Sequence, residues 1–220
     1  MSKAQFPPDV FNPDCHQCPR LSQFLDSVKL DYPHYHCRPV EPFGLKHPGL
    51  LIVGLAPGKH GANATGRPFT GDHAGIILYE TLYKFGFSNQ PDATAQNDGL
   101  KLKNCRITNA VKCLPPENKP TGAEIKTCNA YLQAELSGLK KGAVILALGG
   151  IAHKAVISAL GLKQVDHPFG HGLKYPLPRE QQLLTSYHCS RYNTQTRRLT
   201  TAMFEQIFRN IRRILDKDSG

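Results

Sequence analysis

The sequence predicts an α/β protein built on a parallel sheet with helices on both faces. Two observations carry this prediction: short apolar runs recur from residue 50 onward, and stretches of helical periodicity lie between them. Strands that alternate with helices favour a parallel sheet covered on both sides. The length of 220 residues suits one domain that buries roughly 70% of its unfolded surface, so we expect a single domain over residues 1–220.

The individual elements follow from local patterns. Residues 1–49 are rich in Pro, His and Cys and are expected to be irregular, apart from a helix over 21–30. A polar loop is expected at 88–98. Buried apolar runs bounded by Gly, Pro or polar residues predict strands within 50–56, 105–113, 142–150 and 182–188. Helical patterns lie at 73–86, 122–139, 151–161 and 200–217, and the last places Met203, Ile207, Ile211 and Leu215 on one face.

The composition is that of an ordinary globular protein, with 40% hydrophobic and 20% charged residues. No stretch approaches the roughly 20 apolar residues that a membrane helix needs. The N-terminus lacks the apolar core of a signal peptide. We therefore expect a cytoplasmic protein with no membrane partner.

The charge is strongly basic. Lys and Arg number 27 against 17 Asp and Glu, a formal charge of +10. Such an excess attracts polyanions such as DNA or RNA. The alternative is a merely solvated basic surface, which we expect of Arg209, Arg212 and Arg213 in the last helix.

Seven cysteines are many for an intracellular chain, and an odd number cannot pair completely within it. In a reducing compartment, clustered cysteines bind metals more often than they form disulfides. Four thiolates could bind zinc or an iron–sulfur cluster, and their spacing does not choose between these or exclude unrelated core cysteines. The four are Cys15, Cys18, Cys113 and Cys128. Weaker candidates are Cys37, Cys105, Cys189 and the HYHC run at 34–37.

Polar segments follow three strands at their carboxyl ends, where open α/β sheets bind ligands. They lie at 58–72, 109–118 and 188–200. The glycines of the first segment permit close approach of the backbone to a ligand. The alternative is that this segment is only a glycine-rich surface turn. It is not the phosphate-binding loop of nucleotide hydrolases, because three residues rather than four separate Gly54 from Gly58, and His60 follows Lys59.

The other two segments carry candidates for nucleic-acid binding. Asn109 offers two donors and an acceptor, enough to recognise the edge of a base, although a lone Asn is more often a turn former. His188 also lies at a strand end. Basic and aromatic groups follow it, a mixture that suits a loop that grips the DNA backbone or inserts a wedge, or alternatively a solvated basic loop. They are Arg191, Tyr192, Arg197 and Arg198.

Taken together, these segments resemble the uracil-DNA glycosylase superfamily, and most closely its family 5 (UDGb) branch. Residues 54–75 resemble the first motif, including the apolar Leu55 and Ala56 and the TGD at 70–72. Residues 107–113 resemble the second conserved block. Residues 186–200 resemble the third motif, with Cys189 in place of a Pro and Arg197 in place of a Gly. The resemblance runs from residue 15 to about residue 200.

This resemblance implies a three-layer α/β/α sandwich with a four-stranded parallel sheet. It implies a DNA-repair enzyme that hydrolyses the N-glycosidic bond of uracil, and of other deaminated or damaged bases, in double- or single-stranded DNA. We expect a monomer associated with the nucleoid. It also implies a structural [4Fe–4S] cluster on Cys15, Cys18, Cys113 and Cys128.

The residues suit such chemistry. A base inside a duplex must be flipped out, at a cost of about a few kcal/mol. Gly54 would let the backbone approach that base, Phe69 would stack on it for about 1–3 kcal/mol, and Asn109 would bond its polar edge. Asp72 would oppose the positive charge on the sugar, and His188 with backbone N–H groups the negative charge on the departing base. The alternative for Asp72 is a helix cap.

Two rival functions make different demands on the sequence. A zinc-dependent nucleobase deaminase needs His-x-Glu or Cys-x-Glu together with Pro-Cys-x-x-Cys. The chain has no His-x-Glu, and Asp14 precedes its only Cys-x-x-Cys. A non-catalytic DNA-binding module with a structural metal would explain the charge and the cysteines, but not three polar loops at strand ends.

Overall fold

The computed structural model describes residues 11–217. Residues 1–10 make up most of the N-terminal stretch in which no signal peptide is expected, and they lie outside the described residues. The strands are β1 (Phe43–Gly44), β2 (Leu50–Gly54), β3 (Cys105–Asn109), β4 (Val144–Leu148), β5 (Lys174–Pro176) and β6 (Gln182–Ser186). The helices are α1 (Pro19–Asp31), α2 (Ala62–Thr65), α3 (His73–Lys84), α4 (Gly122–Ser137), α5 (Gly150–Ala159), α6 (Arg191–Gln195) and α7 (Thr201–Lys217). Two short 3-10 helices are η1 (Pro116–Asn118) and η2 (Gln164–Asp166).

The sheet has the order β1-β3-β2-β4-β6-β5. Its four central strands are the four predicted apolar runs, and they are parallel. β1 and β5 add antiparallel pairs at the two edges. Neither edge strand was predicted, because strands of two and three residues carry no apolar run; they cover edges that would otherwise expose unpaired backbone groups.

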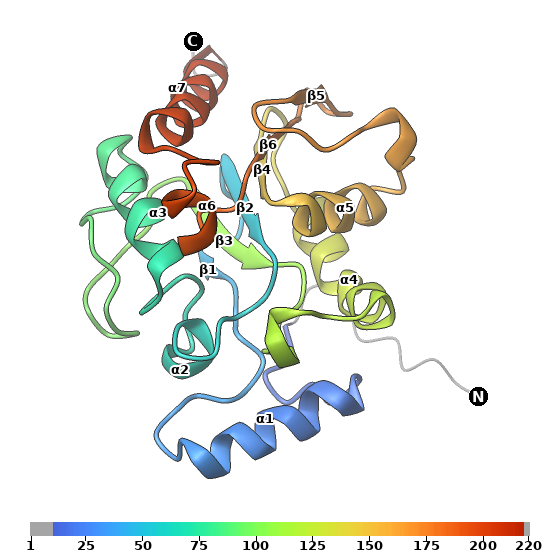
Figure 1. Ribbon diagram of the computed structural model, residues 1–220. Coiled ribbons are helices and arrows are strands. Elements are labelled where there is room, and N and C mark those ends of the chain that lie inside the picture. The colour runs from blue at the N-terminus through green and yellow to red at the C-terminus, as the bar shows by residue number, and fades with distance from the viewer. Residues whose placement is uncertain (1–10, 218–220) are drawn as a thin grey trace.

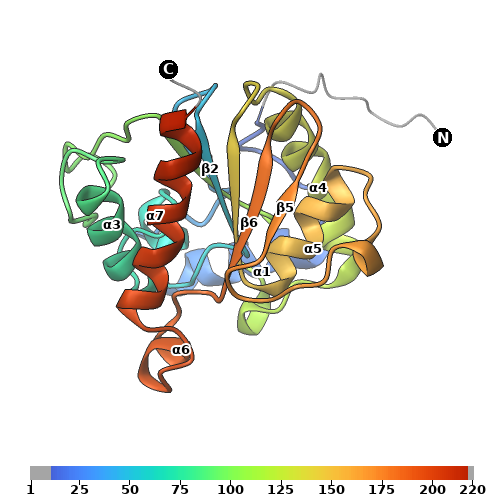
Figure 2. The ribbon, with the colours of Figure 1, turned by 90° about the horizontal axis from the view of Figure 1, so that it is seen from above.

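The predicted three-layer α/β/α arrangement is confirmed. One face of the sheet packs with α3 and α7 around Leu50, Ile52 and Leu146. The opposite face packs with α4 and α5 around Leu51 and Ile145. Alternate residues of β2 and β4 thus enter different cores, as the period of two in a strand requires. Figures 1 and 2 show the two helical layers on either side of the strands.

The five predicted helices all form, and their ends lie within two residues of the predicted ones. Local capping sets two of the starts. Thr121 and Glu124 make a capping box at the start of α4, and Asp72 caps α3. The short helices α2 and α6, inside the first and third polar segments, were not predicted.

One basic residue of α7 is not solvated as expected. Arg212 donates from Nε to the carbonyl oxygen of Phe85 at 2.7 Å, and from Nη2 to the same oxygen. Its guanidinium also lies 3.7 Å from the centre of the Phe87 ring. The expectation was wrong for Arg212, because the last carbonyl groups of α3 have no partner within their own helix and a cation satisfies them well. Arg209 and Arg213 are exposed.

The N-terminal segment packs through α1 below the three layers (Figure 1). Leu21, Leu25 and Val28 form a third apolar cluster with the chain that follows β3. Arg20 joins α1 to α4 through an ion pair with Glu124 at 2.7 Å. Within residues 11–217, no helix combines the length and the apolar character that spanning a bilayer requires.

Candidate active site

The parallel strands bring the three polar segments to one edge of the sheet. Gly54 and Asn109 are register partners at the ends of β2 and β3, and His188 follows the end of β6 by two residues. The segments after these strands line a cavity of about 430 Å³, within the range of small-ligand sites. Phe69, Asp72, Asn109, His188 and Arg191 all contribute to its wall. The structure thus brings the three predicted segments together around one cavity.

Asn109 and Phe69 converge on Gly54 at the base of this site. A methyl group at position 54 would lie 2.5 Å from Oδ1 of Asn109 and 2.7 Å from Cζ of Phe69. Only glycine therefore allows both side chains to occupy these places. Asn109 is 3% exposed, and its buried Oδ1 has no hydrogen-bond partner among the described residues. An unsatisfied buried acceptor costs about 1–3 kcal/mol, which a ligand that donates to it would recover.

Phe69 is held in an unusual conformation. Its φ of 55° lies in the left-handed region, which is rare for a bulky residue. Its ring stacks against His188 with centroids 5.9 Å apart and planes 28° apart. The neighbouring Pro68 carbonyl accepts a hydrogen bond from the Tyr79 hydroxyl at 2.7 Å. The ring therefore reaches the cavity from a strained loop that its surroundings hold in place.

A buried ion pair anchors the same loop. Arg67 Nη1 and Nη2 donate to Asp98 Oδ1 and Oδ2 at 2.8 and 2.6 Å, and the two side chains are 3% and 9% exposed. Arg67 Nε also donates to Thr70 Oγ1 at 2.8 Å. The guanidinium and the backbone N–H groups around Asp98 hold the pKa of that carboxyl well below its usual range. This pair was not predicted, since the segment 88–98 reads in the sequence only as a polar loop.

Asp72 both caps α3 and lines the cavity. Its Oδ1 accepts from the Gly75 backbone N–H at 2.9 Å. Its Oδ2 lies close to Gly61, where a methyl group would approach it to 2.6 Å. Burial raises the pKa of Asp72, although the N–H groups of Gly75 and Ala74 oppose this. The capping role weighed as an alternative is therefore present, and it leaves the carboxylate at the cavity wall.

His188 is a neutral side chain at physiological pH. Burial lowers the pKa of its imidazole to about 4. A neutral imidazole carries one N–H donor and one acceptor. Its backbone is held by Asn193, whose Nδ2 donates to the His188 carbonyl at 2.8 Å. His188 can therefore offer a hydrogen bond without bringing a positive charge into the site.

The third segment forms a rim over the cavity. Ser190 caps α6 by accepting from the backbone N–H of Asn193, and Figure 2 shows α6 projecting beyond the strand ends. Tyr192 is 70% exposed there. Arg197, which replaces the Gly of the third motif, has a φ of 57°, the left-handed conformation that glycine adopts most readily. A cation therefore stands at a position whose backbone conformation favours glycine.

Two further contacts in this segment were not predicted. His73 Nε2 lies 3.0 Å from Thr194 Oγ1, so the start of α3 is tied to α6. Arg198 stacks its guanidinium over Tyr187 at 4.6 Å. Cys189, which replaces the Pro of the motif, is fully buried behind the rim. No pattern along the chain signals these contacts, since each joins residues through the fold.

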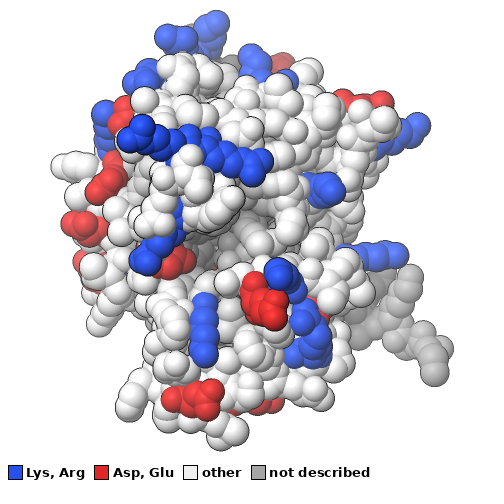
Figure 3. All heavy atoms as spheres, in the orientation of Figure 1, with Lys and Arg blue, Asp and Glu red and all other residues white. Residues whose placement is uncertain are grey.

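The surface around the cavity is basic. Figure 3 shows this face hollowed near its centre, with Lys and Arg side chains above and below the hollow and a few Asp and Glu side chains among them. Arg191 lines the cavity itself. This distribution suits a polyanion laid across the hollow.

The four predicted cysteine ligands line one small cavity between α1, the chain after β3, and α4. Burial and the neighbouring thiols raise the pKa of Cys18 to about 11 and also raise the pKa of Cys113. The Lys112 backbone N–H donates to Cys128 Sγ at 3.3 Å. The buried Tyr131 hydroxyl at this cavity has no hydrogen-bond partner among the described residues.

These features fit a site built from four thiolates, such as an iron–sulfur cluster. Within residues 11–217, no three His, Cys, Asp or Glu converge closely enough for a single metal ion. The four cysteines would supply the four thiolates that hold an iron–sulfur cluster. Donors such as the Lys112 N–H commonly surround its sulfurs. The weaker HYHC candidate does not converge either: His36 Nε2 lies 3.3 Å from the Pro39 carbonyl, and Asn63 donates to Cys37.

Comparisons with known proteins agree with this site. Residues 41–212 match the family model of the uracil DNA glycosylase superfamily. A type-5 uracil-DNA glycosylase of Thermus thermophilus is 43% identical over 205 residues, which cover 91% of this chain and 93% of that protein. One from Mycobacterium leprae is 42% identical over 209 residues, 91% of each chain. A type-4 uracil-DNA glycosylase of Pyrobaculum aerophilum is 38% identical over 114 residues, 51% of this chain and 50% of that one.

Proposed function

The chain belongs to the uracil DNA glycosylase superfamily, and from this premise we propose that it excises uracil from DNA by hydrolysing the N-glycosidic bond. The observation that carries the proposal is the single cavity shared by Phe69, Asp72, Asn109 and His188. A non-catalytic DNA-binding module would have no use for a half-buried carboxylate and an unsatisfied amide oxygen in one cavity.

Asn109 accounts for recognition of uracil. The base presents an N3–H donor beside the O4 acceptor, and an amide side chain offers the complementary acceptor and donor. Oδ1 of Asn109, which has no partner among the described residues, accepts from N3–H, and Nδ2 donates to O4. Cytosine presents an acceptor and an amino group in these places, so it would leave the pairs mismatched. The Phe69 ring stacks on the face of the flipped base.

Asp72 and His188 account for catalysis. The bond between C1′ and N1 breaks with its electron pair on the base, so the sugar becomes cationic and the base anionic. The carboxylate of Asp72 opposes the first charge. The neutral imidazole of His188 donates a hydrogen bond to O2, where the second charge develops, and a preorganised donor of this kind is worth about 10²–10³ in rate. Water adds to C1′, and its proton leaves to the base or to solvent. The products are free uracil and an abasic site.

A [4Fe–4S] cluster on Cys15, Cys18, Cys113 and Cys128 is part of the proposal. Its support is that the four thiols line one cavity. When bound, such a cluster supplies cross-links between α1, the chain after β3, and α4. Its site is separate from the cavity of Asp72 and His188, so every step above is assigned to side chains of the chain itself.

The basic rim would grip the DNA, with Arg191, Tyr192, Arg197 and Arg198 along the phosphates or as a wedge. Both double- and single-stranded DNA with uracil or other deaminated bases are proposed substrates. The cavity is complete within one chain, which supports action as a monomer. An enzyme with this substrate would work at the nucleoid, in the cytoplasm.

The test is excision from labelled oligonucleotides that contain one uracil. Alkali cleaves the abasic product, so wild-type protein should yield a single cut at the uracil, in a duplex or in a single strand. Asn109→Ala should still bind the DNA but choose poorly between uracil and cytosine. Tight DNA binding by the wild type without release of uracil or any other deaminated base would instead support the DNA-binding module.

A further inference from the structure

A second cavity, of about 250 Å³, lies next to the candidate active site. The two cavities share Leu55 and His188 as a common wall. On its other sides the second cavity is lined by the start of α5 and by Phe169, Tyr187 and Arg198. It therefore sits where the segments after β4 and β6 meet, one wall away from the proposed place of the flipped base.

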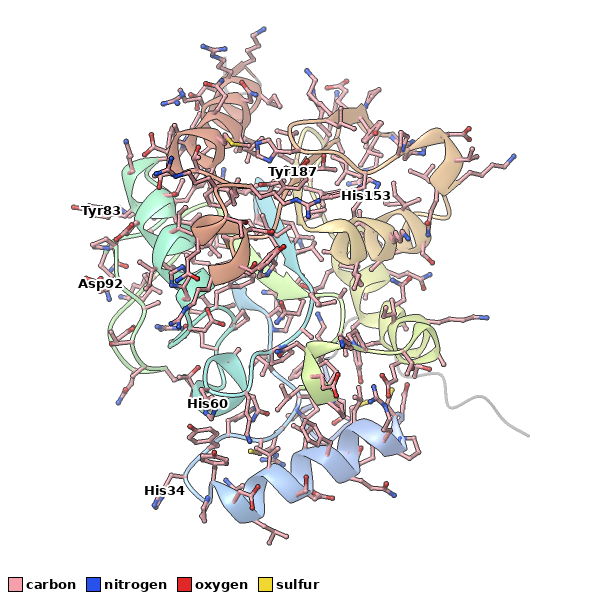
Figure 4. All side chains as sticks on the ribbon, in the orientation of Figure 1. His34, His60, Tyr83, Asp92, His153 and Tyr187 are labelled. Carbon is pink, nitrogen blue, oxygen red and sulfur yellow. The ribbon has the colours of Figure 1, made fainter. Side chains whose placement is uncertain are left out.

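Three planar groups, His171, Tyr187 and Arg198, are in contact beside this cavity. The Tyr187 ring stacks with His171, at 5.2 Å and 27°, and carries the Arg198 guanidinium over it, at 4.6 Å from its centre. Phe169 lies 6.2 Å from Tyr187 at a tilt of 60°, and its other neighbour is His153 on α5 at 5.7 Å. Figure 4 shows Tyr187 and His153 together near α5, on the opposite side from Tyr83.

This lining suits a flat ring more than a free anion. The Tyr187 backbone N–H donates to His171 Nδ1 at 3.3 Å, and burial lowers the pKa of His171, so this part of the stack is neutral. Arg198 is an exposed cation over the Tyr187 ring. Guanidinium planes and aromatic rings are the surfaces on which proteins stack unpaired bases.

We propose that the second cavity binds the nucleobase adjacent to the damaged nucleotide, stacked on the Arg198 guanidinium and against Phe169. The proposal rests on the proposed function, since it places this base one nucleotide from the uracil across the shared His188 wall. Base stacking tolerates every sequence, because each base has a π-face. The cavity would thus hold the strand open beside the flipped base without restricting the sequence in which uracil is removed.

The experiment measures binding of oligonucleotides with a 2′-fluoro-deoxyuridine, whose fluorine disfavours the sugar cation and so suppresses cleavage. One neighbour of this residue at a time is replaced by a tetrahydrofuran, which keeps the backbone and removes the base. We expect Kd for wild-type protein to rise about 5- to 150-fold at one of the two positions, from the usual worth of base stacking. In Phe169→Leu and Tyr187→Leu this penalty should shrink toward one.

Tyr83→Leu is the matched control, because Tyr83 is 51% exposed on α3, away from both cavities. It should keep the full penalty. Each penalty is a ratio of two Kd values for one protein sample, so partial unfolding of a variant cancels.

Equal binding with and without either neighbouring base would overturn the proposal, as would a penalty unchanged in both variants. A third outcome would also overturn it: binding is lost when a methylphosphonate neutralises the adjacent phosphate, but is unchanged when the adjacent base is removed. Failure of the proposed function would show separately, as no release of uracil from ordinary DNA.

Discussion

Asp72 combines a structural and a chemical feature in one carboxyl group. Its Oδ1 caps α3, while burial against the first loop raises its pKa. A raised pKa means that the folded protein disfavours the ionised form, so the carboxylate is held at a cost to stability. A cost to stability of this kind is expected of a residue whose negative charge is needed for function, and not of a residue that only caps a helix.

Asp72→Asn separates the two roles. Asn caps a helix about as well as Asp, and it brings no buried charge. We expect most turnover on uracil DNA to be lost, with Tm at pH 7 equal to or above that of the wild type. Any gain in Tm should shrink as the pH falls to about 3, below the ordinary carboxyl pKa, where Asp72 becomes protonated in the unfolded chain as well. Single-turnover rates with melting curves at both pH values test this; normal turnover would show that Asp72 is only a cap.

His188 should affect both rate and acid stability. His188→Ala should slow excision about 10²–10³-fold, because a preorganised donor to the departing base is removed. Between pH 6.5 and about 4 the unfolded chain binds a proton at this residue while the folded protein does not, since burial lowers the pKa of His188 to about 4. Wild-type stability therefore falls as the pH drops through this window, and the variant should lose less. Excision by the variant at the wild-type rate would refute the catalytic role.

At the scale of elements, the first loop depends on the segment at 88–98. Asp98 accepts both guanidinium bonds from Arg67 and also backbone N–H groups of Thr94, Ala95 and Leu100. This one carboxylate therefore holds a polar loop in shape and binds it to the loop that presents Phe69. The shape of the cavity is thus set partly by a segment that does not line it.

Asp98→Asn should destabilise the protein by about 3–5 kcal/mol, the usual cost of leaving one member of a buried ion pair unpaired. The pKa of Asp98 is lowered, so its stabilisation is complete above pH 4 and is lost as the pH falls through that lower pKa. The deficit of the variant should therefore be full at pH 7 and shrink in acid. Urea unfolding at several pH values measures it, with Asp92→Asn, exposed in the same loop (Figure 4), as the control. Equal effects of the two substitutions would contradict the assignment.

The proposed cluster joins three segments distant in sequence, so its loss should loosen the N-terminal part of the protein. Protein purified without oxygen should be brown, and Cys128→Ser should be colourless with a lower Tm. Cys105→Ala, in a core away from the four thiols, should keep the colour. Iron and sulfide analysis with the visible spectrum decides the matter; a colourless wild-type preparation with one zinc per chain would exclude the cluster.

For the whole molecule, the +10 charge and the basic rim predict DNA binding that weakens steeply with salt. Removing a side chain that neutralises one phosphate should flatten the slope of log K against log salt by about 0.7–0.9. We expect that change in Arg191→Ala, because Arg191 lines the cavity on the rim. Arg213→Ala, exposed on α7, should leave the slope unchanged. Fluorescence anisotropy over a salt series measures both; equal slopes for Arg191→Ala and wild type would remove the rim from the interface.

The sequence by itself determined the central strands, the crossover helices and the three segments at the strand ends. Runs such as Leu50–Gly54 and the spacing of Ile207 and Ile211 are local patterns, and burial of apolar side chains enforces them in any fold that forms. Parallel strands then bring the segments after them to one edge, so Asn109 and His188 could be placed near each other from the sequence alone.

Only the tertiary structure decided the partners of these residues. Arg67 and Asp98 are 31 residues apart, and His73 and Thr194 are 121 apart. The contacts on Tyr187 join His171 to the third segment. Burial makes the ion pair of Arg67 and Asp98 necessary, because an unpaired charged group inside a protein is costly. The group that pairs with each buried polar side chain comes from a segment that is a neighbour only after folding. No periodicity or spacing along the chain predicts that partner.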